Sequence, residues 1–528
     1  MESRKIIDAS YSDAPALDFE SQVNSFMQSI SFVSTGCIQD GTSFLETAES
    51  VFKQLNKQWN WLVDEKLFSV LENNALKNKM TADQRVLILN SESVFASLNL
   101  LEVWGTVFLH SGFSISSHFT DEIIKHNEAV GFDLLYTDLQ LLNDDDTEEH
   151  VFRRPHRCVE RLLHQNYVSG ALAVKKHVLE EVFAQGVTAL NEIEARAICN
   201  VVKRNGAIRH VFEPIVRARR SHVEKQMLTG SPEWLEAASS AVETMQQGFV
   251  HAPGPTGKLT IRRSPKKKVS ISVVIPTRGD KKRIWGIETD LIENVVKSLL
   301  DKTSIEDFEV VVVHDVNASY GKHIKSFERY GNRVKTVPYE KPFNFSEKCN
   351  VGALHSAAEI IVLLNDDIEV IDPWWLDHLV GYLELSEVGA VGPLLLLDNG
   401  LVQTAGHVNE PLPANYFSGK PIGLDTFPEP LDIPCEVSGL TAACLAVRRD
   451  VFDEVGGFCE DLPNNFNDVD FCLKIQGTGR TLIWTPLARL YHFEATTRIT
   501  TVTEEETQFI KDRWGRTFGV DLYRSRID

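Results

Sequence analysis

The sequence predicts an α/β protein of two domains, each built on a doubly wound, mostly parallel sheet with flanking helices. Strand-like apolar runs alternate with helical runs, which is the pattern of such sheets. The chain has 528 residues, more than a single hydrophobic core usually encloses. The best strand, Ile360 to Leu364, is a continuous β-branched run that ends at Asn365, Asp366 and Asp367.

The composition is that of a globular protein, with 43% hydrophobic and 24% charged residues. A formal net charge of −20 argues against a nucleic-acid partner. Eight cysteines without CxxC spacing favour reduced, structural thiols. We find neither a signal peptide nor a run near the ~18 apolar residues of a transmembrane segment. We therefore expect a cytoplasmic protein, with peripheral membrane association as the alternative.

Residues 1–225 form the first predicted domain. Runs at 29–35, 61–63, 85–90 and 133–142 favour strands, and 43–56 has helical spacing. The acidic run 144–150 is interpreted as a solvated loop rather than a metal site.

Residues 226–268 are expected to connect the domains. A helix-like stretch is followed by proline, glycine and the basic run RRSPKKK at 262–268. We interpret the basic run as a solvated connector; contact with phosphate or an anionic surface is the alternative.

Residues 269–528 form the second predicted domain. Strands are expected at 269–277, 308–315 and 360–364, with a helix at 291–303 between the first two. Asp315 and Asp367 then end parallel strands at one edge of the sheet, where open α/β sheets bind ligands. Adjacent carboxylates repel one another and favour a cation, although two solvated aspartates would explain the pattern equally well.

A further helix is expected to begin near Asn467. Asp468 and Asp470 lie in its first turn, where the helix dipole keeps carboxylates ionised, as a general base requires. Ordinary helix capping is the alternative. His492 follows the strand 481–486 and is either structural or a ligand.

Four ordered blocks carry a family resemblance: VSISVVIPTRGD (269–280), FEVVVVHDVNAS (308–319), NFSEKCNVGA with IIVLLNDDIEV (344–353 and 360–370), and the long block 456–492. Together they resemble family 2 glycosyltransferases, which have the GT-A fold and bind nucleotide-diphospho-sugars. The resemblance covers roughly 269–498. It is closest to the branch that builds bacterial surface polysaccharides, including rhamnosyl and galactofuranosyl transferases.

The resemblance implies a catalytic base, Asp468, and a Mn²⁺ or Mg²⁺ ion held by Asp367 and His492. The donor-binding residues would be Pro276, Thr277, Arg278, Asp315, Lys348, Asn350, Asn365 and Asp366. Acceptor contacts would come from Trp374, His407 and Asp470, with helix packing as the alternative for Trp374. Two positions depart from the family: Asn365 replaces the first aspartate of the DXD signature, and Asn467 replaces a glutamate.

These residues imply an inverting, metal-dependent glycosyltransferase. It would move a sugar from a nucleotide-sugar donor to a hydroxyl of a glycan, lipid-linked glycans included, or of a protein. A sugar nucleotidyltransferase is one alternative, although TRGDKKR is a poor match to its glycine-rich loop. A non-catalytic glycan-binding scaffold is the other.

The first half contains a fainter copy of the second. Residues 29–35 parallel 271–277, and Asp64 parallels Asp315. We also align Ser91 and Glu92 with Asp366 and Asp367, Glu192 with Asp468, and Arg220 with His492. In this copy, acidic residues are absent or are replaced by glutamate, whose side chain is longer. Residues 1–225 are therefore predicted to be a degenerate GT-A-like domain without catalysis that docks acceptor or partner.

Overall fold

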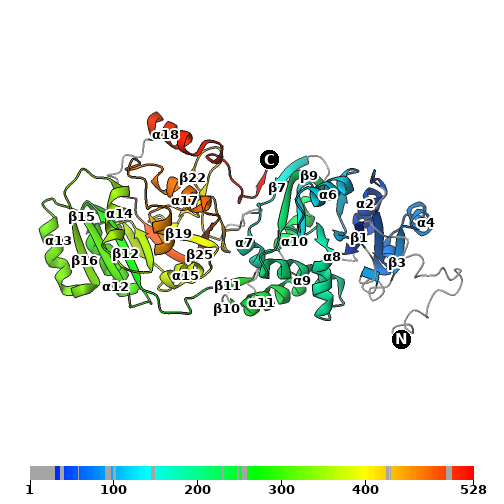
Figure 1. Cartoon of the computed structure of the whole chain (residues 1–528), viewed down its shortest axis with the longest axis horizontal. Coiled ribbons are helices and arrows are strands. Elements are labelled where there is room, and N and C mark those ends of the chain that lie inside the picture. Colours follow the sequence, from blue (N-terminus) through cyan, green and yellow to red (C-terminus); the bar gives the residue numbers. More distant parts are fainter. Residues whose placement is uncertain are drawn as a thin grey trace. The chain divides into compact units, whose positions relative to one another are not determined.

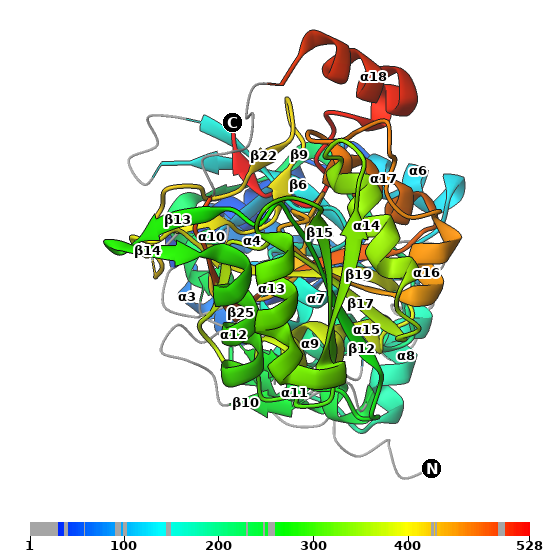
Figure 2. The same ribbon diagram turned by 90° about the vertical axis from the view of Figure 1, so that its left-hand side faces the viewer.

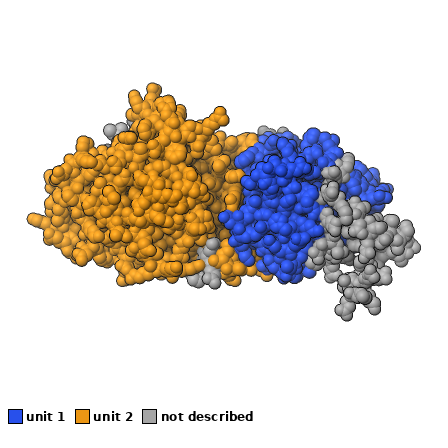
Figure 3. All heavy atoms as spheres, in the orientation of Figure 1, with its two compact units in different colours: residues 1–151, 168–223 blue, residues 152–167, 224–528 orange. Residues whose placement is uncertain are grey.

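A computed structural model describes residues 30–35, 41–56, 59–89, 97–98, 103–143, 149–228, 231–245, 249–251, 259–423, 427, 430–494 and 502–528. The chain divides into two compact units (Figure 3). Unit 1 comprises 1–151 and 168–223, and unit 2 comprises 152–167 and 224–528. The predicted boundary at 225 lies close to the one observed, but the segment 152–167 belongs to unit 2.

Unit 2 contains a sheet of strand order β16-β15-β12-β17-β24-β19-β25-β18. Its first four strands in that order are β16 (Val334–Tyr339), β15 (Glu309–Asp315), β12 (Ile271–Thr277) and β17 (Ile360–Leu364). The other four are β24 (Cys444–Arg448), β19 (Val388–Leu396), β25 (Thr481–His492) and β18 (Ile368–Val370). Strand β12 is central and parallel to both neighbours, so that Val274 pairs with Val311 on one side and Leu363 on the other.

Helices cover both faces of this sheet (Figure 1). On one face α12 (Leu291–Lys302) and α15 (Trp375–Leu383) pack against one set of alternate strand residues. On the other face lie α14 (Phe345–Leu354), α16 (Arg449–Glu454) and α17 (Asn467–Gly477). Because successive strand residues point to opposite faces, the continuous apolar runs of β12 and β17 supply both cores.

The other elements of unit 2 lie around this framework. The hairpin β13 (Lys281–Ile284) and β14 (Ile287–Asp290) projects from the unit (Figure 2). The helical elements are α7 (Val159–His164), α11 (Pro232–Met245), α13 (Tyr320–Phe327), η1 (Glu328–Arg333), α18 (Glu504–Trp514) and η2 (Gly515–Thr517). The remaining strands are β10 (Phe249–His251), β11 (Thr260–Arg262), β20 (Val402–Thr404), β21 (His407–Val408), β22 (Ala414–Asn415), β23 (Cys435–Glu436) and β26 (Arg526–Ile527).

Unit 1 is built on a second sheet, in which β3, β2, β1, β4, β8, β6 and β7 follow one another and β9 pairs with β6 and β5. The strands are β1 (Ile30–Thr35), β2 (Trp59–Asp64), β3 (Val86–Leu89), β4 (Gly105–His110), β5 (Phe113–Ile115), β6 (Leu134–Leu142), β7 (Glu149–Arg153), β8 (Ala171–Lys175) and β9 (Ile208–Arg219). The helices are α2 (Gly41–Phe52), α3 (Glu65–Val70), α4 (Asn74–Ala82), α6 (Phe119–Ala129), α8 (Lys176–Ala184), α9 (Leu190–Lys203) and α10 (Arg220–Leu228).

The two sheets share one topology. Strands β3-β2-β1-β4-β8-β6-β9 correspond to β16-β15-β12-β17-β24-β19-β25, with antiparallel pairs at the same places. Strand β5 pairs with β9 as β18 pairs with β25. The predicted repeat is therefore present, but one alignment is wrong. The counterpart of β17 is β4, whereas β3, which precedes Ser91 and Glu92, corresponds to the edge strand β16. Ser91 and Glu92 themselves lie outside the described residues.

The segment 152–167 joins unit 2 through buried polar contacts. The Glu160 carboxylate, on α7, lies 2.5 Å from Arg263 Nη2 and accepts a hydrogen bond from the Tyr382 hydroxyl at 3.0 Å. Arg263 belongs to the basic run predicted to be a solvated connector, and that interpretation is wrong for this residue, which is 1% exposed. Gly381 in α15 permits the contact, because a Cβ atom there would lie 2.5 Å from the Arg263 carbonyl carbon.

The structure confirms the predicted α/β class with two mostly parallel sheets. No helix in the described ranges is long and apolar enough to span a membrane. Of the acidic run 144–150, residues 144–148 lie outside the described residues.

Candidate active site

The carboxyl ends of β12, β15 and β17 bring several predicted donor-binding residues together. Thr277 ends β12 and donates its hydroxyl to Asp366 Oδ2 at 2.5 Å, while it accepts the Gly279 backbone N–H at 2.8 Å. Asp315 ends β15, the neighbouring strand. Parallel strands end at the same edge of a sheet, so these side chains converge.

Lys348 on α14 links two of these strand ends. Its ammonium group donates to the Thr277 carbonyl at 2.6 Å and lies 2.7 Å from Asp315 Oδ1. The side chain is fully buried, and burial lowers the pKa of Lys348, an effect that the Asp315 carboxylate opposes. This lysine therefore sets the spacing between the Thr277 turn and Asp315.

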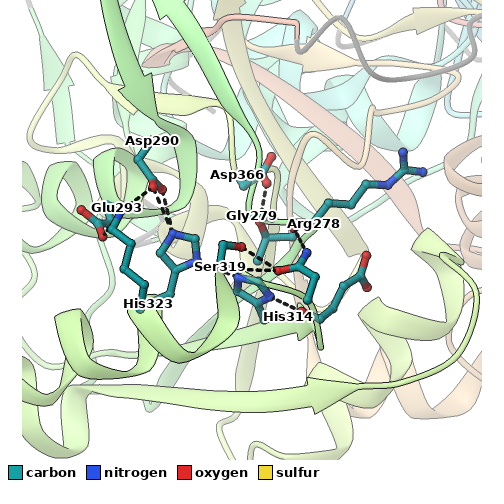
Figure 4. Close-up of polar contacts among 12 residues, drawn as sticks. Arg278, Gly279, Asp290, Glu293, His314, Ser319, His323 and Asp366 are labelled. Atoms are coloured by element: carbon teal, nitrogen blue, oxygen red, sulfur yellow. Dashed lines mark hydrogen bonds and ion pairs between the residues drawn. The ribbon is translucent and has the colours of Figure 1, made fainter.

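Two predicted donor-binding residues beside this turn are held by packing. Pro276 is buried in β12, opposite Val313 of β15. The Arg278 guanidinium lies 3.8 Å from the centroid of the Phe343 ring, and its side chain extends away from Asp366 (Figure 4).

Asp366 carries an unfavourable charge. Burial and the neighbouring Asp367 carboxylate raise the pKa of Asp366 to about 7, against the effect of the Thr277 hydrogen bond. Two adjacent carboxyl groups at the end of a buried strand are relieved by a cation.

Asp367 points towards β25. Its Oδ1 lies 3.1 Å from His492 Nε2, and the Asn365 amide lies 3.3 Å from the same nitrogen. The side chains of Asp367 and His492 are 4% and 7% exposed, respectively. Strand β18 keeps them together, because Ile368 pairs with His492 in the antiparallel register.

This pair fits a divalent ion. Two adjacent ligands at about 2.1 Å from an octahedral ion are about 3 Å apart, close to the separation of Asp367 Oδ1 and His492 Nε2. The oxygen and nitrogen donors suit Mn²⁺, and Mg²⁺ would rely more on the carboxylates.

Asp468 is tied to the same edge through residues 442 and 443. The Asn365 backbone N–H donates to the Ala443 carbonyl at 2.9 Å, and the Ala442 N–H donates to Asp468 Oδ2 at 3.3 Å. Asp468 Oδ1 also accepts the Val469 N–H at 2.9 Å, in the first turn of α17. The side chain is partly exposed. A partly exposed carboxylate near the proposed metal ligands can take a proton from an acceptor.

His407 lies on the Asp468 side of this edge. Its backbone N–H donates to the Gly439 carbonyl at 2.8 Å, on the loop that leads to Ala442. Burial lowers the pKa of His407, and the negative charge of Asp468 opposes that shift. An acceptor contact at His407 stays a prediction.

Trp374 lies away from this edge. The Ser304 N–H, just after α12, donates to the Pro373 carbonyl at 2.9 Å, whereas α12 begins beside Asp280 at the other end of the sheet. A helix of 12 residues spans about 18 Å. Strand β18 leads away from Asp367 towards Trp374, which is 57% exposed, so an acceptor contact at Trp374 stays a prediction.

Two other predicted contacts have structural partners. The Asn350 amide accepts the Phe458 N–H at 2.8 Å and donates to the Phe458 carbonyl at 3.0 Å, so it fastens the loop after α16. Asp470 is fully buried and pairs with Arg513. The side chains of Asn350 and Asp470 are therefore both bound within the protein.

A second cluster of possible metal ligands, which sequence reasoning missed, consists of Asp290, Glu293 and His323 (Figure 4). Their ligand atoms lie within 4.8 Å of one another. The Lys322 ammonium group lies 2.9 Å from Asp290 and 3.2 Å from Glu293, where it serves as their cation. Their spacing, with the histidine 30 residues further along and on another helix, matches no metal motif.

The corresponding edge of unit 1 has different chemistry. The register of β4 with β8 and of β17 with β24 places His110, Ser111 and Gly112 at the positions of Asn365, Asp366 and Asp367. His110 Nε2 lies 2.6 Å from Glu194 Oε2, and the Ser169 hydroxyl donates to Glu194 Oε1 at 3.0 Å. Glu194 is two residues beyond Glu192, which instead pairs with Arg196 at 3.3 Å.

Part of unit 2 is similar in sequence to known proteins. Residues 272–456 match the family described as Glycosyl transferase family 2. The uncharacterized protein y4gI of Sinorhizobium fredii is 33% identical over 267 residues, which is 46% of this chain and 27% of that protein. The O-antigen biosynthesis protein RfbC of Myxococcus xanthus is 26% identical over 482 residues, which is 86% of this chain and 36% of that protein. The chain thus spans about a third or less of the length of these relatives.

Two solved structures match part of this chain at 15% identity. The mannosyltransferase PcManGT from Pyrobaculum calidifontis, in complex with GDP-Man and Mn²⁺, matches with a TM-score of 0.32 over 44% of this chain and 60% of its own. GalNAc-T7 with UDP, GalNAc and Mn²⁺ matches with a TM-score of 0.40 over 55% and 58%. The family match covers β12 to α16, including Thr277, Asp315 and Asp367. The chain therefore carries a domain of glycosyl transferase family 2, within unit 2.

Proposed function

We propose that unit 2 is an inverting glycosyltransferase that moves a sugar from a nucleoside-diphosphate donor to a hydroxyl group of a glycan. One observation carries this proposal: Asp468 and the Asp367–His492 pair are joined through Ala442 and Ala443 at one sheet edge. That is the arrangement needed for a base on one side of a donor and a cation on the other.

The donor would be held by the ends of β12 and β15. Asp315, positioned by Lys348, would accept hydrogen bonds from a ribose or base, and the Thr277 turn would lie beside it. Asp367 and His492 would hold Mn²⁺ or Mg²⁺ against the diphosphate. When bound, the ion neutralises charge on the departing nucleoside diphosphate.

Asp468 would take the proton from the acceptor hydroxyl as that oxygen attacks the anomeric carbon. A single displacement with a single base inverts the anomeric configuration. His407, beside Asp468, would contact the acceptor. The name of the Myxococcus relative, an O-antigen biosynthesis protein, favours a surface glycan as the acceptor class. We place this reaction in the cytoplasm, where nucleotide sugars are made.

We infer that unit 1 does not catalyse transfer. His110, Ser111 and Gly112 supply no carboxylate at the positions of the DXD signature. Glu194 is already satisfied by His110 and Ser169 within the protein. The proposed role of unit 1 is to dock the acceptor or a partner.

The test combines binding and turnover in the full chain. A thermal-shift screen of UDP-, GDP- and dTDP-sugars with Mn²⁺ should identify one donor, because only a bound ligand stabilises the fold by mass action. Asp468→Asn should keep that shift and lose about 10²–10⁴-fold in transfer. Asp453→Asn, on an exposed face of α16, is the matched control. Undiminished transfer by Asp468→Asn would refute the assignment of Asp468 as the base. If metal-dependent transfer remained and depended on residues of unit 1, the inference that unit 1 is inactive would be refuted.

A further inference from the structure

Asp470 is enclosed by the C-terminal helix α18. Its Oδ1 accepts the Trp514 indole N–H at 2.9 Å and lies 2.7 Å from Arg513 Nε. Its Oδ2 lies 3.7 Å from Lys474 Nζ, one turn further along α17. The side chain is 0% exposed, so two cations and an indole balance a buried carboxylate.

A second contact from α18 reaches the same segment. The Asn465 side-chain amide donates to Glu506 at 3.0 Å. Glu506 is fixed in turn, because it forms a capping box with Thr503 at the start of α18. Helix α18 therefore holds the segment 465–470 at both of its ends.

Asp468 lies between these two attachments. Apart from contacts to neighbouring residues of its own turn, its carboxylate accepts the Ala442 N–H at 3.3 Å, a long hydrogen bond. The residue before the helix, Phe466, has a positive φ of 57°, which is unfavourable for a bulky side chain. Helix α17 thus begins at a strained residue, and a base must be held within about 0.5 Å of its working position.

We propose that Arg513 and Trp514, through Asp470, are positioning residues that fix Asp468 for catalysis. The inference rests on the proposed function of Asp468. It replaces the predicted acceptor contact at Asp470 with a structural link, and it gives the C-terminal helix a role in turnover. We call Asp470, Arg513 and Trp514 the α18 latch.

The latch can be weakened without removing its buried charge. Arg513→Met leaves Asp470 with Lys474 and Trp514, and Arg513 is 41% exposed, so the variant is expected to fold. Trp514→Phe keeps an aromatic ring at this position and removes the indole N–H donor. Lys511→Met is the matched control, because Lys511 is exposed on the same helix and outside the latch.

The first readout is independent of activity. Hydrogen exchange of the full chain should be about tenfold faster in peptides covering 465–472 for Arg513→Met and Trp514→Phe, and unchanged for Lys511→Met. Local opening governs such exchange. Unaltered exchange in the latch variants would overturn the proposal, whether or not the chain transfers sugar.

The second readout separates positioning from donor binding. With the donor found by the thermal-shift screen, both latch variants should lose about 10- to 100-fold in kcat, because a misplaced group about 1 Å away costs that much. The donor KM should stay within twofold. Arg513→Lys should recover part of the rate. A rise in donor KM at constant kcat would overturn the positioning role, whereas an inactive wild-type chain would instead count against the proposed function.

Discussion

Replacing Glu160 by glutamine should destabilise unit 2, although Glu160 lies between two strands of unit 1 in the sequence. Its carboxylate is 5% exposed and is bound by Arg263, Tyr382 and His164 Nε2, the last at 3.1 Å. The substitution keeps the shape and removes the charge. It removes the negative charge that faces Arg263, which is 1% exposed.

The size of the expected loss in stability follows from the pKa of Glu160. Its contacts with Arg263 and His164 outweigh burial and lower the pKa of Glu160 from 4.5 to about 2. A shift of this size corresponds to about 3 kcal/mol, at about 1.4 kcal/mol for each pH unit. Breaking a buried ion pair costs a similar ~3–5 kcal/mol. For a domain of this size we expect Tm to fall by about 5–10 °C.

The same pKa shift sets how the stability lost in Glu160→Gln should change with pH. A carboxyl group with a lowered folded pKa stabilises the protein above its unfolded pKa, and this contribution is lost as the pH falls from about 4.5 towards 2. The difference between wild type and Glu160→Gln should therefore be full at pH 7 and shrink towards pH 2. Scanning calorimetry measures the change in Tm at each pH, and hydrogen exchange of peptides 156–167 and 259–266 measures the local loss of stability. Glu454→Gln, which removes a half-exposed partner of Arg480 in unit 2, is the control and should cost under about 1 kcal/mol. Equal Tm values for Glu160→Gln and wild type at pH 7 would refute the reasoning.

Two other predictions concern unit 2. Burial and the nearby Glu160 raise the pKa of Glu436 from 4.5 to about 7. The contribution of Glu436 to the free energy of unfolding should therefore fall by up to about 3 kcal/mol as the pH rises from 4.5 to 7. In urea unfolding, the stability of Glu436→Gln should depend less on pH over this interval, and a dependence as steep as that of wild type would contradict the assignment. His492→Ala should weaken Mn²⁺ binding at least about tenfold, because it removes one of two adjacent ligands. A manganese titration followed by thermal shift measures this effect, with His355→Ala, exposed on the surface of unit 2, as the control; equal affinities would remove His492 from the site.

Strands β12, β15 and β17 of unit 2 could be predicted because each contains a continuous apolar run that ends in polar residues. In unit 1 the same criterion selected Val86–Leu89 and missed Gly105–His110. The first is an edge strand whose residues are mostly half-buried, and the second is central and almost fully buried. Composition does not distinguish an edge strand from a central one when both are short, so the repeat was aligned to the wrong strand.

Asp367, His492 and Asp468 were predictable in position because strand ends and helix starts fix where such side chains point. Asp470 and Asn350 were not. Their partners, Trp514 and Phe458, lie 44 and 108 residues further along the chain, and no local pattern records those contacts. The position of Trp374 was not predictable for a different reason, since it depends on the direction in which β18 leaves the edge.

The two units show that this topology does not by itself specify a metal site. At the end of β4, the Glu194 carboxylate has partners within the protein, because His110 and Ser169 both bind it. At the end of β17, Asp366 and Asp367 are neighbours, and their repulsion contributes to the raised pKa of Asp366. A buried charge is tolerated when it is paired. The carboxylate at the first edge is paired within the protein, whereas the adjacent carboxyl groups at the second would be stabilised by a cation. The difference in activity that we propose therefore follows from a few residues at one position of a shared fold.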